Sequence, residues 1–148
     1  MNLKKIITEK TVTLDIRGET KQEIIRELLE VAGAAGFVSD LDGAFDALME
    51  RENKMSTAMQ NGIAMPHAKT DAVTKLIGVI GLKKDGVDFH SIDGQPTRIF
   101  VMTLSPLNRA GPHIQFLAEI GRLLSQEGTT DRILAAASPS DVCELLGG

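Results

Sequence analysis

The sequence predicts one layered α/β domain. Segments with the hydrophobic pattern of strands alternate with segments patterned as helices, and no Pro-, Gly- or Ser-rich linker divides the 148 residues. A chain of this length fits one domain and can bury most of its apolar surface. Its composition, 43% hydrophobic and 24% charged, is typical of a globular protein. We therefore expect a single domain over residues 1–148.

The first strand and the first helix are indicated by local patterns. Alternating apolar residues over 11–16 predict a half-buried strand. A helix should follow at once, because Thr20 and Glu23 form a capping box ahead of an apolar stripe at helical spacing. Gly33 marks the end of that stripe.

A second helix, a loop and two interior strands should come next. The helix is expected over about 41–52, with Ala44, Phe45, Leu48 and Met49 toward the core. Residues 54–73 are rich in turn formers and small side chains, which predicts a loop. The nearly continuous apolar runs at 76–82 and 98–104 are typical of strands buried on both faces.

The pattern in the last third of the chain predicts helices. Pro112 should open an amphipathic helix. Its expected buried face consists of Ile114, Leu117, Ala118, Ile120, Leu123 and Leu124. Another helix start lies near Thr130, and Ser138 with Pro139 and Asp141 should cap a short terminal helix.

Composition also excludes several classes of function. A net charge of −4 with no basic run gives no electrostatic footprint for nucleic acid. The apolar stretches fall short of the roughly 20 residues of a membrane helix, so no membrane insertion is expected. The first residues lack a signal-peptide pattern, which favours a cytoplasmic location. Without Trp or Tyr, direct carbohydrate binding is disfavoured, and the single Cys143 reads as a packing residue.

His67 is the first candidate for chemistry. It follows Pro66, whose ring fixes φ and pushes Met65 toward an extended conformation. A rigidly presented imidazole suits a nucleophile, whereas the plainer interpretation is a loop histidine bonded to nearby backbone.

His113 is the second candidate. It follows Pro112 at the first turn of a predicted helix, where free backbone N–H groups favour an anion and disfavour a protonated imidazole. We expect a neutral side chain there, next to a bound phosphate; the alternative is an exposed first-turn residue. His90 lies in a polar turn and is expected to be inert.

Arg51, Ser56 and Thr57 could bind phosphate. Arg51 either complements the dipole at the end of the second helix or grips phosphate oxygens with its bidentate guanidinium. Ser56 and Thr57 are either turn and cap residues or hydroxyl donors to the same phosphate.

A metal site is a weaker alternative. His67 and His113 would need Asp71 or Glu52 as further ligands, and no close ligand spacing of the H-x-x-x-H kind joins them.

These residues together resemble a known family. The pairs RE at 51–52 and ST at 56–57, then GIA at 62–64 and PH at 66–67, resemble the signature of the fructose/mannitol-type (type 2) IIA domains of the bacterial phosphoenolpyruvate-dependent phosphotransferase system (PTS). That family includes a nitrogen-regulatory branch. The segment that starts at His113 resembles the family's second histidine at the head of a long helix. Met55 and Ala58 stand where many members have Gly, which affects loop shape and partner preference.

The resemblance implies a fold, a reaction and partners. The fold would be a mixed, mainly parallel sheet flanked by helices. His67 would accept a phosphoryl group from the phosphocarrier protein HPr or its nitrogen-branch paralogue, with His113 and Arg51 in the active site. The group would then pass to a cysteine of a IIB domain. No cofactor is implied, and no Mg²⁺, because the donor is a phosphohistidine.

Two further expectations concern partners. Met55, Met59 and Met65 are candidate docking residues, because methionine adapts to more than one partner, whereas Ile63 is expected in the core. The alternative function is a nitrogen-type regulator, in which phosphorylation of His67 controls binding to target proteins and no sugar is moved.

Overall fold

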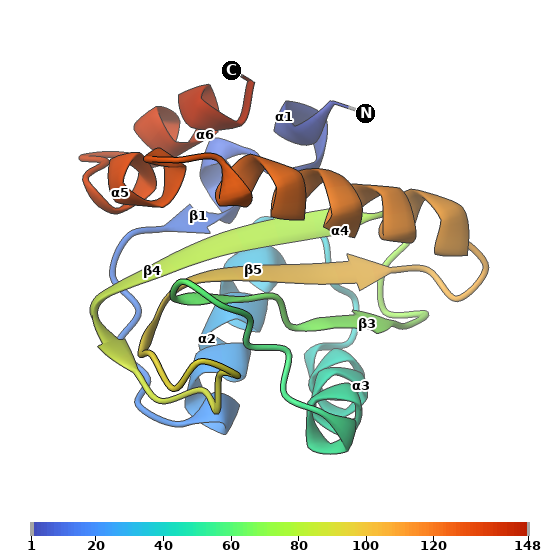
Figure 1. Cartoon of the computed structure of the whole chain (residues 1–148). Helices are drawn as coiled ribbons and strands as arrows, with labels where there is room; N and C mark the ends of the chain where they lie inside the picture. Colours follow the sequence, from blue (N-terminus) through green and yellow to red (C-terminus); the bar gives the residue numbers. More distant parts are fainter. Residues whose placement is uncertain (1, 148) are drawn as a thin grey trace.

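The computed structural model describes residues 2–147 and confirms an α/β fold with a five-stranded sheet between two layers of helices (Figure 1). The elements in chain order are α1 (Leu3–Ile6), η1 (Glu9–Thr11), β1 (Val12–Thr13), α2 (Lys21–Ala34), α3 (Leu41–Lys54), β2 (Ile63–Ala64), β3 (His67–Lys69), β4 (Ile77–Val87), β5 (Thr97–Ser105), α4 (Ala110–Ser125), α5 (Thr129–Leu134) and α6 (Pro139–Gly147).

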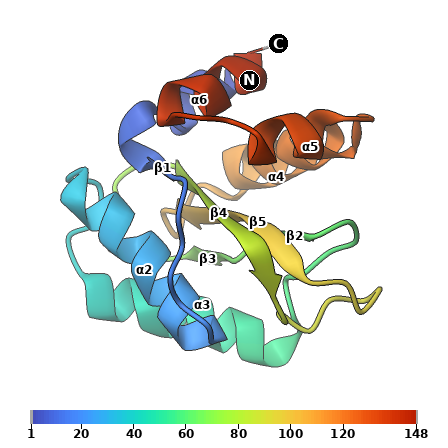
Figure 2. The same ribbon diagram turned by 90° about the vertical axis from the view of Figure 1, so that its left-hand side faces the viewer.

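The sheet is mixed and mainly parallel, as the resemblance implied. Its order is β1-β4-β5-β2, and β3 also pairs with β5. β4 and β5 are antiparallel, whereas β1 runs parallel to β4, and β2 and β3 run parallel to β5. α2 and α3 cover one face, and α1, α4, α5 and α6 lie over the other (Figure 2).

The two central strands are buried on both faces, as their sequence predicted. Along β5, Phe100 and Met102 join the core under α2 and α3, whereas Ile99 and Val101 join the core under α4 and α6. This alternation follows from the period of two in a strand. Gly78 of β4 permits close packing of α4, because a Cβ there would lie 3.1 Å from the ring of Phe116.

The capped starts of α2 and α3 follow from local sequence. Thr20 and Glu23 form the predicted capping box, and the Asp40 side chain accepts a hydrogen bond from the Gly43 N–H. The core-facing side of α3 contains Ala44 and Leu48, and the helix extends two residues beyond the predicted end at 52.

The predicted loop at 54–73 is partly wrong, because it contains β2 and β3. Ile63 pairs with Ile99 and His67 with Thr103 in the same register, so the two strands form one edge of the sheet interrupted at Met65 and Pro66. Small side chains and turn formers hid this edge, which is held by pairing with a strand more than thirty residues later. The strand predicted at 11–16 is also shorter, although the Ile16 N–H donates to the Leu82 carbonyl at 2.9 Å.

The buried face of α4 differs from the prediction. The helix begins at Ala110, and its buried residues are His113, Phe116, Ile120 and Leu124. Ile114 and Ala118, which were expected in the core, are exposed. The stripe was misplaced because a histidine, rather than an aliphatic residue, occupies the first buried turn.

Candidate functional site

His67 begins β3, and a backbone carbonyl fixes its ring. Its Nδ1 lies 2.8 Å from the Met65 carbonyl oxygen. Because a carbonyl oxygen only accepts hydrogen bonds, Nδ1 must carry the ring hydrogen in this contact. The neutral imidazole therefore keeps its lone pair on Nε2. The side chain is half-buried, and a nitrogen oriented in this way with a free lone pair meets the requirement for a nucleophile.

His113 reaches the same site from α4. The centroids of the two imidazole rings are 5.6 Å apart, with an angle of 85° between the ring planes. Burial, together with smaller effects of the neighbouring His67 and Lys69, lowers the pKa of His113 to about 4. The side chain is therefore neutral near pH 7. Burial, rather than the helix terminus considered from sequence, is the main cause.

One nitrogen of His113 is unpartnered. Nε2 is buried and has no hydrogen-bond partner among residues 2–147. Buried polar groups are normally satisfied, and an exception asks for an explanation such as a functional role. Among the described residues, the Thr97 and Thr103 hydroxyls of β5 are also without a partner. The Nε2 of His113 is thus available to a ligand atom.

Arg51 enters the site from the last turn of α3. Its Nη1 donates a hydrogen bond of 2.9 Å to the Met55 carbonyl. Arg51 and His67 together line two neighbouring pockets. A mainly apolar pocket of about 410 Å³ adds Met59, Met65, Ile92 and Leu117. A more polar pocket of about 310 Å³ adds Glu50, Lys54, Lys69 and His113. With Arg51, its cations outnumber the single carboxylate, so its walls favour an anion.

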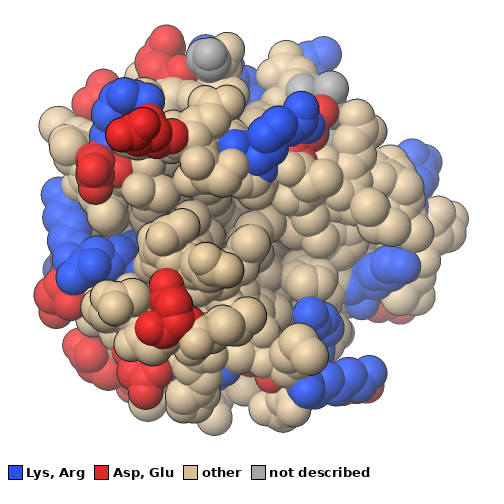
Figure 3. Space-filling model, viewed as in Figure 1, with Lys and Arg blue, Asp and Glu red and all other residues tan. Residues whose placement is uncertain are grey.

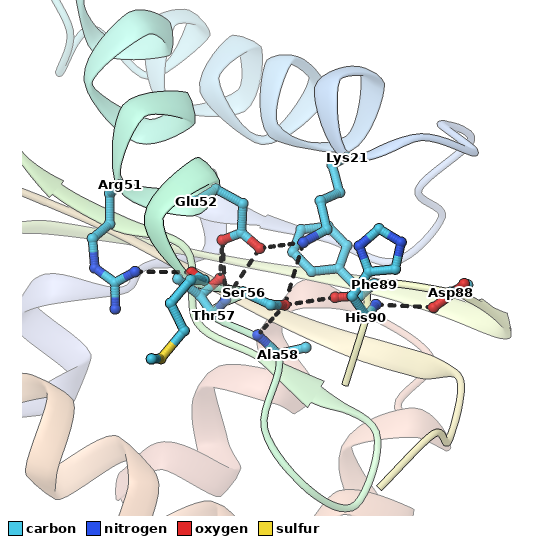
Figure 4. A network of polar contacts seen from close by, with 10 residues as sticks. Lys21, Arg51, Glu52, Ser56, Thr57, Ala58, Asp88, Phe89 and His90 are labelled. Carbon is cyan, nitrogen blue, oxygen red and sulfur yellow. Dashed lines mark hydrogen bonds and ion pairs between the residues drawn. The ribbon is translucent and has the colours of Figure 1, made fainter. Parts of the chain in front are cut away.

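Ser56 and Thr57 line the apolar pocket, but both hydroxyl hydrogens are in use (Figure 4). Ser56 Oγ donates to the Phe89 carbonyl at 2.7 Å, and Thr57 Oγ1 donates to Glu52 at 2.6 Å. Phosphate binding by these hydroxyls stays a prediction that requires each to exchange its present acceptor.

The candidate docking residues divide into two groups. Met55 and Met59 are 71% and 43% exposed. Met65 is 6% exposed and packs in the core, so its expected place on the surface is wrong. Its position between β2 and β3 turns the side chain toward α4 rather than solvent. Ile63 is a core residue, as predicted.

The surface carries further apolar and basic residues that sequence reasoning missed. Ile92, in the loop between β4 and β5, is 85% exposed and lines the apolar pocket. Lys69 lines the polar pocket together with His67, which lies two residues before it on β3. Alternation along β3 would have pointed to Lys69, had the strand been recognised. Figure 3 shows a broad area without charged side chains on the face seen in Figure 1.

Neither a metal cluster nor a membrane helix is found in the described part of the chain. No three His, Cys, Asp or Glu side chains within residues 2–147 converge as metal ligands would. Over the same residues, no helix is both long and apolar enough to cross a membrane.

Comparison with known sequences points to one family. The sequence profile of the family described as "Phosphoenolpyruvate-dependent sugar phosphotransferase system, EIIA 2" matches residues 5–147. The chain is 37% identical to the fructose-specific EIIA component of Haloferax volcanii, over 91% of this chain and 88% of that protein. It is 26% identical to a nitrogen regulatory protein of Bradyrhizobium diazoefficiens, over 99% and 95% of the two chains.

Solved structures agree with the sequence comparison. The nitrogen regulatory protein IIA-Ntr of Neisseria meningitidis superposes with a TM-score of 0.89 at 23% identity, over 97% of this chain and 98% of that one. The mannitol IIA enzyme of Escherichia coli, solved in complex with phosphorylated mannitol IIB, superposes with a TM-score of 0.80 at 26% identity, over 95% and 96% of the chains.

Proposed function

The chain belongs to the EIIA type 2 family of phosphoenolpyruvate-dependent sugar phosphotransferase systems, and from this premise we propose that it carries a phosphoryl group on Nε2 of His67. One observation supports the assignment to Nε2 above all others. The Met65 carbonyl occupies Nδ1–H and leaves the lone pair of Nε2 free for attack.

The transfer requires one bond to form and one to break. The Nε2 lone pair attacks the phosphorus of a phosphohistidine on a donor protein, and the electron pair of the donor's P–N bond returns to the donor ring. The hydrogen stays bonded to Nδ1, which donates it to the Met65 carbonyl, and Nε2 carries no hydrogen, so no proton has to leave the attacking nitrogen. Catalysis then depends on position and on neutralising charge, as is general for phosphoryl transfer.

Arg51 and His113 are proposed to bind the transferred group. Arg51 lines both pockets beside His67, and its guanidinium can exchange the Met55 carbonyl for two phosphoryl oxygens. His113 Nε2 lacks a partner in the described residues, so the tautomer with hydrogen on Nε2 could donate to a phosphoryl oxygen. Lys54 and Lys69 make the same pocket more favourable to the anion.

We propose an HPr-type phosphocarrier as donor and a cysteine of a IIB domain as acceptor. The acceptor is supported by the mannitol IIA relative, which was solved with phosphorylated IIB. Exposed Met55, Met59 and Ile92 offer an apolar surface for docking. Because phosphoenolpyruvate is the ultimate donor in this family, we place the reaction in the cytoplasm.

A regulatory role is the second candidate. The similarity to nitrogen regulatory proteins over nearly the whole chain favours it, although the identity of 26% is lower than the 37% shared with the fructose-specific component. In that role the same phosphorylation of His67 would control binding to a target protein.

Intact-mass analysis tests the proposal. The chain is incubated with phosphoenolpyruvate, the first phosphotransferase enzyme and HPr, and one acid-labile phosphoryl group is expected. His67→Ala should abolish the gain, whereas His90→Asn should retain it. Transfer onward to a IIB cysteine would favour transport over regulation. A gain that persists in His67→Ala would refute the assignment.

A further inference from the structure

We propose that Glu52 is a positioning residue for His67, which acts through Thr57 and Met65 and depends on Lys21 as its counter-ion. The kinetic part of this inference rests on the proposed function, whereas the structural part concerns the unphosphorylated chain alone.

Glu52 is a buried carboxylate with its acceptor capacity fully committed. Its side chain is 1% exposed. Thr57 donates its backbone N–H to both carboxylate oxygens at 3.1 Å and its hydroxyl to Oε2 at 2.6 Å. Lys21 Nζ lies 2.6 Å from Oε1. Figure 4 shows these bonds converging on the loop that follows α3. A carboxylate held this way fixes the backbone of Thr57.

Thr57 in turn holds the residue that orients His67. The Met65 N–H donates to the Thr57 carbonyl at 3.0 Å. The Met65 carbonyl then accepts from Nδ1 of His67 at 2.8 Å. On the far side of that carbonyl, the ring of Pro66 restricts the backbone. A continuous path of hydrogen bonds therefore runs from Glu52 to the imidazole, and its last bond decides which ring nitrogen keeps the lone pair.

The same helix end also holds Arg51. Arg51 and Glu52 are consecutive residues of α3, and they bind the following loop at Met55 and Thr57 respectively. A shift of this loop would displace the guanidinium and the imidazole together. Glu52 thus affects both groups that are proposed to act on the phosphoryl group.

Lys21 makes the buried carboxylate tolerable. It comes from the first residue of α2, and its Nζ also lies 3.3 Å from Ser56 Oγ and 4.7 Å from the centroid of the Phe89 ring. A buried charge without a partner is strongly unfavourable. Removal of Lys21 should therefore disturb the carboxylate and, through Thr57, the site.

The chain offers matched controls. Glu27 likewise accepts backbone N–H groups, from Arg17 and Gly18, but it holds a turn before α2 with no bond leading to His67 among those of the described residues. Lys83 is a buried lysine that, like Lys21, is bonded to one glutamate, here Glu19 at 3.2 Å. Each control removes a comparable contact outside the path.

The test compares Glu52→Gln and Lys21→Met with Glu27→Gln and Lys83→Met. Imidazole ¹⁵N chemical shifts of the unphosphorylated chain report which nitrogen of His67 carries hydrogen. We expect Nδ1–H in the wild type and in both controls, and a mixture of tautomers in Glu52→Gln and Lys21→Met. Thr57→Val replaces the hydroxyl with a methyl group and keeps the backbone N–H to Glu52, so it should cause a smaller change in the same direction. It remains informative if Lys21→Met does not fold.

Kinetics provide the second readout. In Glu52→Gln, kcat for transfer from phosphorylated HPr should fall roughly 10- to 100-fold, because small displacements of reacting groups have effects of that size. KM should change less than kcat, since Ile92 lies outside this loop and remains in place. An unchanged tautomer and kcat in Glu52→Gln, with a loss of stability equal to that of Glu27→Gln, would overturn the inference. If the wild type accepts no phosphoryl group, the proposed function fails. The ¹⁵N chemical shifts then still decide whether Glu52 orients the imidazole of His67.

Discussion

The buried neutral His113 makes the stability of the fold depend on pH. The pKa of His113 is lowered from 6.5 to about 4, chiefly by burial, whereas an unfolded chain restores the ordinary value. At a pH between these two pKa values, His113 is protonated in the unfolded chain and neutral in the folded chain. Stability from this group is thus fully present above the unfolded pKa and is lost as pH falls toward the folded pKa.

The size of the loss follows from the two pKa values. Lowering the pH from about 7.5 to about 4.5 should reduce the free energy of unfolding by about 2.5 kcal/mol through this residue alone, at about 1.36 kcal/mol per pKa unit. His113→Gln removes the titrating group. Its free energy of unfolding should therefore change less between the two pH values, by about the same 2.5 kcal/mol.

Urea unfolding at both pH values measures this difference. His90→Asn is the control, because His90 is exposed and its φ of 57° is a value that asparagine tolerates. It should show the pH dependence of the wild type. The same pH dependence in His113→Gln as in the wild type would refute the reasoning. So would an NMR titration that gives His113 a pKa at or above 6.5.

Three other substitutions separate chemistry, docking and packing. Arg51→Lys keeps the charge but loses the bidentate fork, so kcat/KM for phosphoryl transfer should fall roughly tenfold or more while urea stability changes little. Met59→Glu should raise KM for the phosphorylated donor without unfolding the domain, whereas the same change at buried Met65 should prevent folding. Equal kinetics in Met59→Glu and wild type would contradict the docking role. Phe116→Ala should lower the free energy of unfolding by about 3–5 kcal/mol in urea, since its ring is fully buried against β4.

Local signals were sufficient for much of the fold. The capping box at Thr20, the apolar runs of β4 and β5, and the start of α6 near Ser138 each appear within a few neighbouring residues. Such elements are set by propensity and hydrophobic period, which act over one or two turns. His67 was also singled out as a candidate from local signals, because Pro66 and the surrounding motif mark it.

Contacts between segments distant in the chain could not be predicted from the sequence. The edge formed by β2 and β3 exists through pairing with β5, and its own residues are small. The sequence marked Glu52 only as part of the RE pair and as a weak candidate metal ligand. The structure shows a buried ion pair with Lys21, thirty-one positions earlier. Met65 is buried although it was expected at a docking surface, and Ile114 is exposed although it was expected in the core. Strand register and helix rotation decide such burial, and neither is encoded at one position.

The sequence by itself determined the class of fold and the family, and it singled out the candidate reactive histidine, since these depend on periodicity and on motifs of adjacent residues. Only the tertiary structure decided that His113 is neutral, that Nε2 of His67 holds the lone pair, and that Glu52 reaches the site through Thr57. The physical reason is that desolvation and hydrogen-bond partners come from whatever the fold brings close, which is seldom the next residue in the chain.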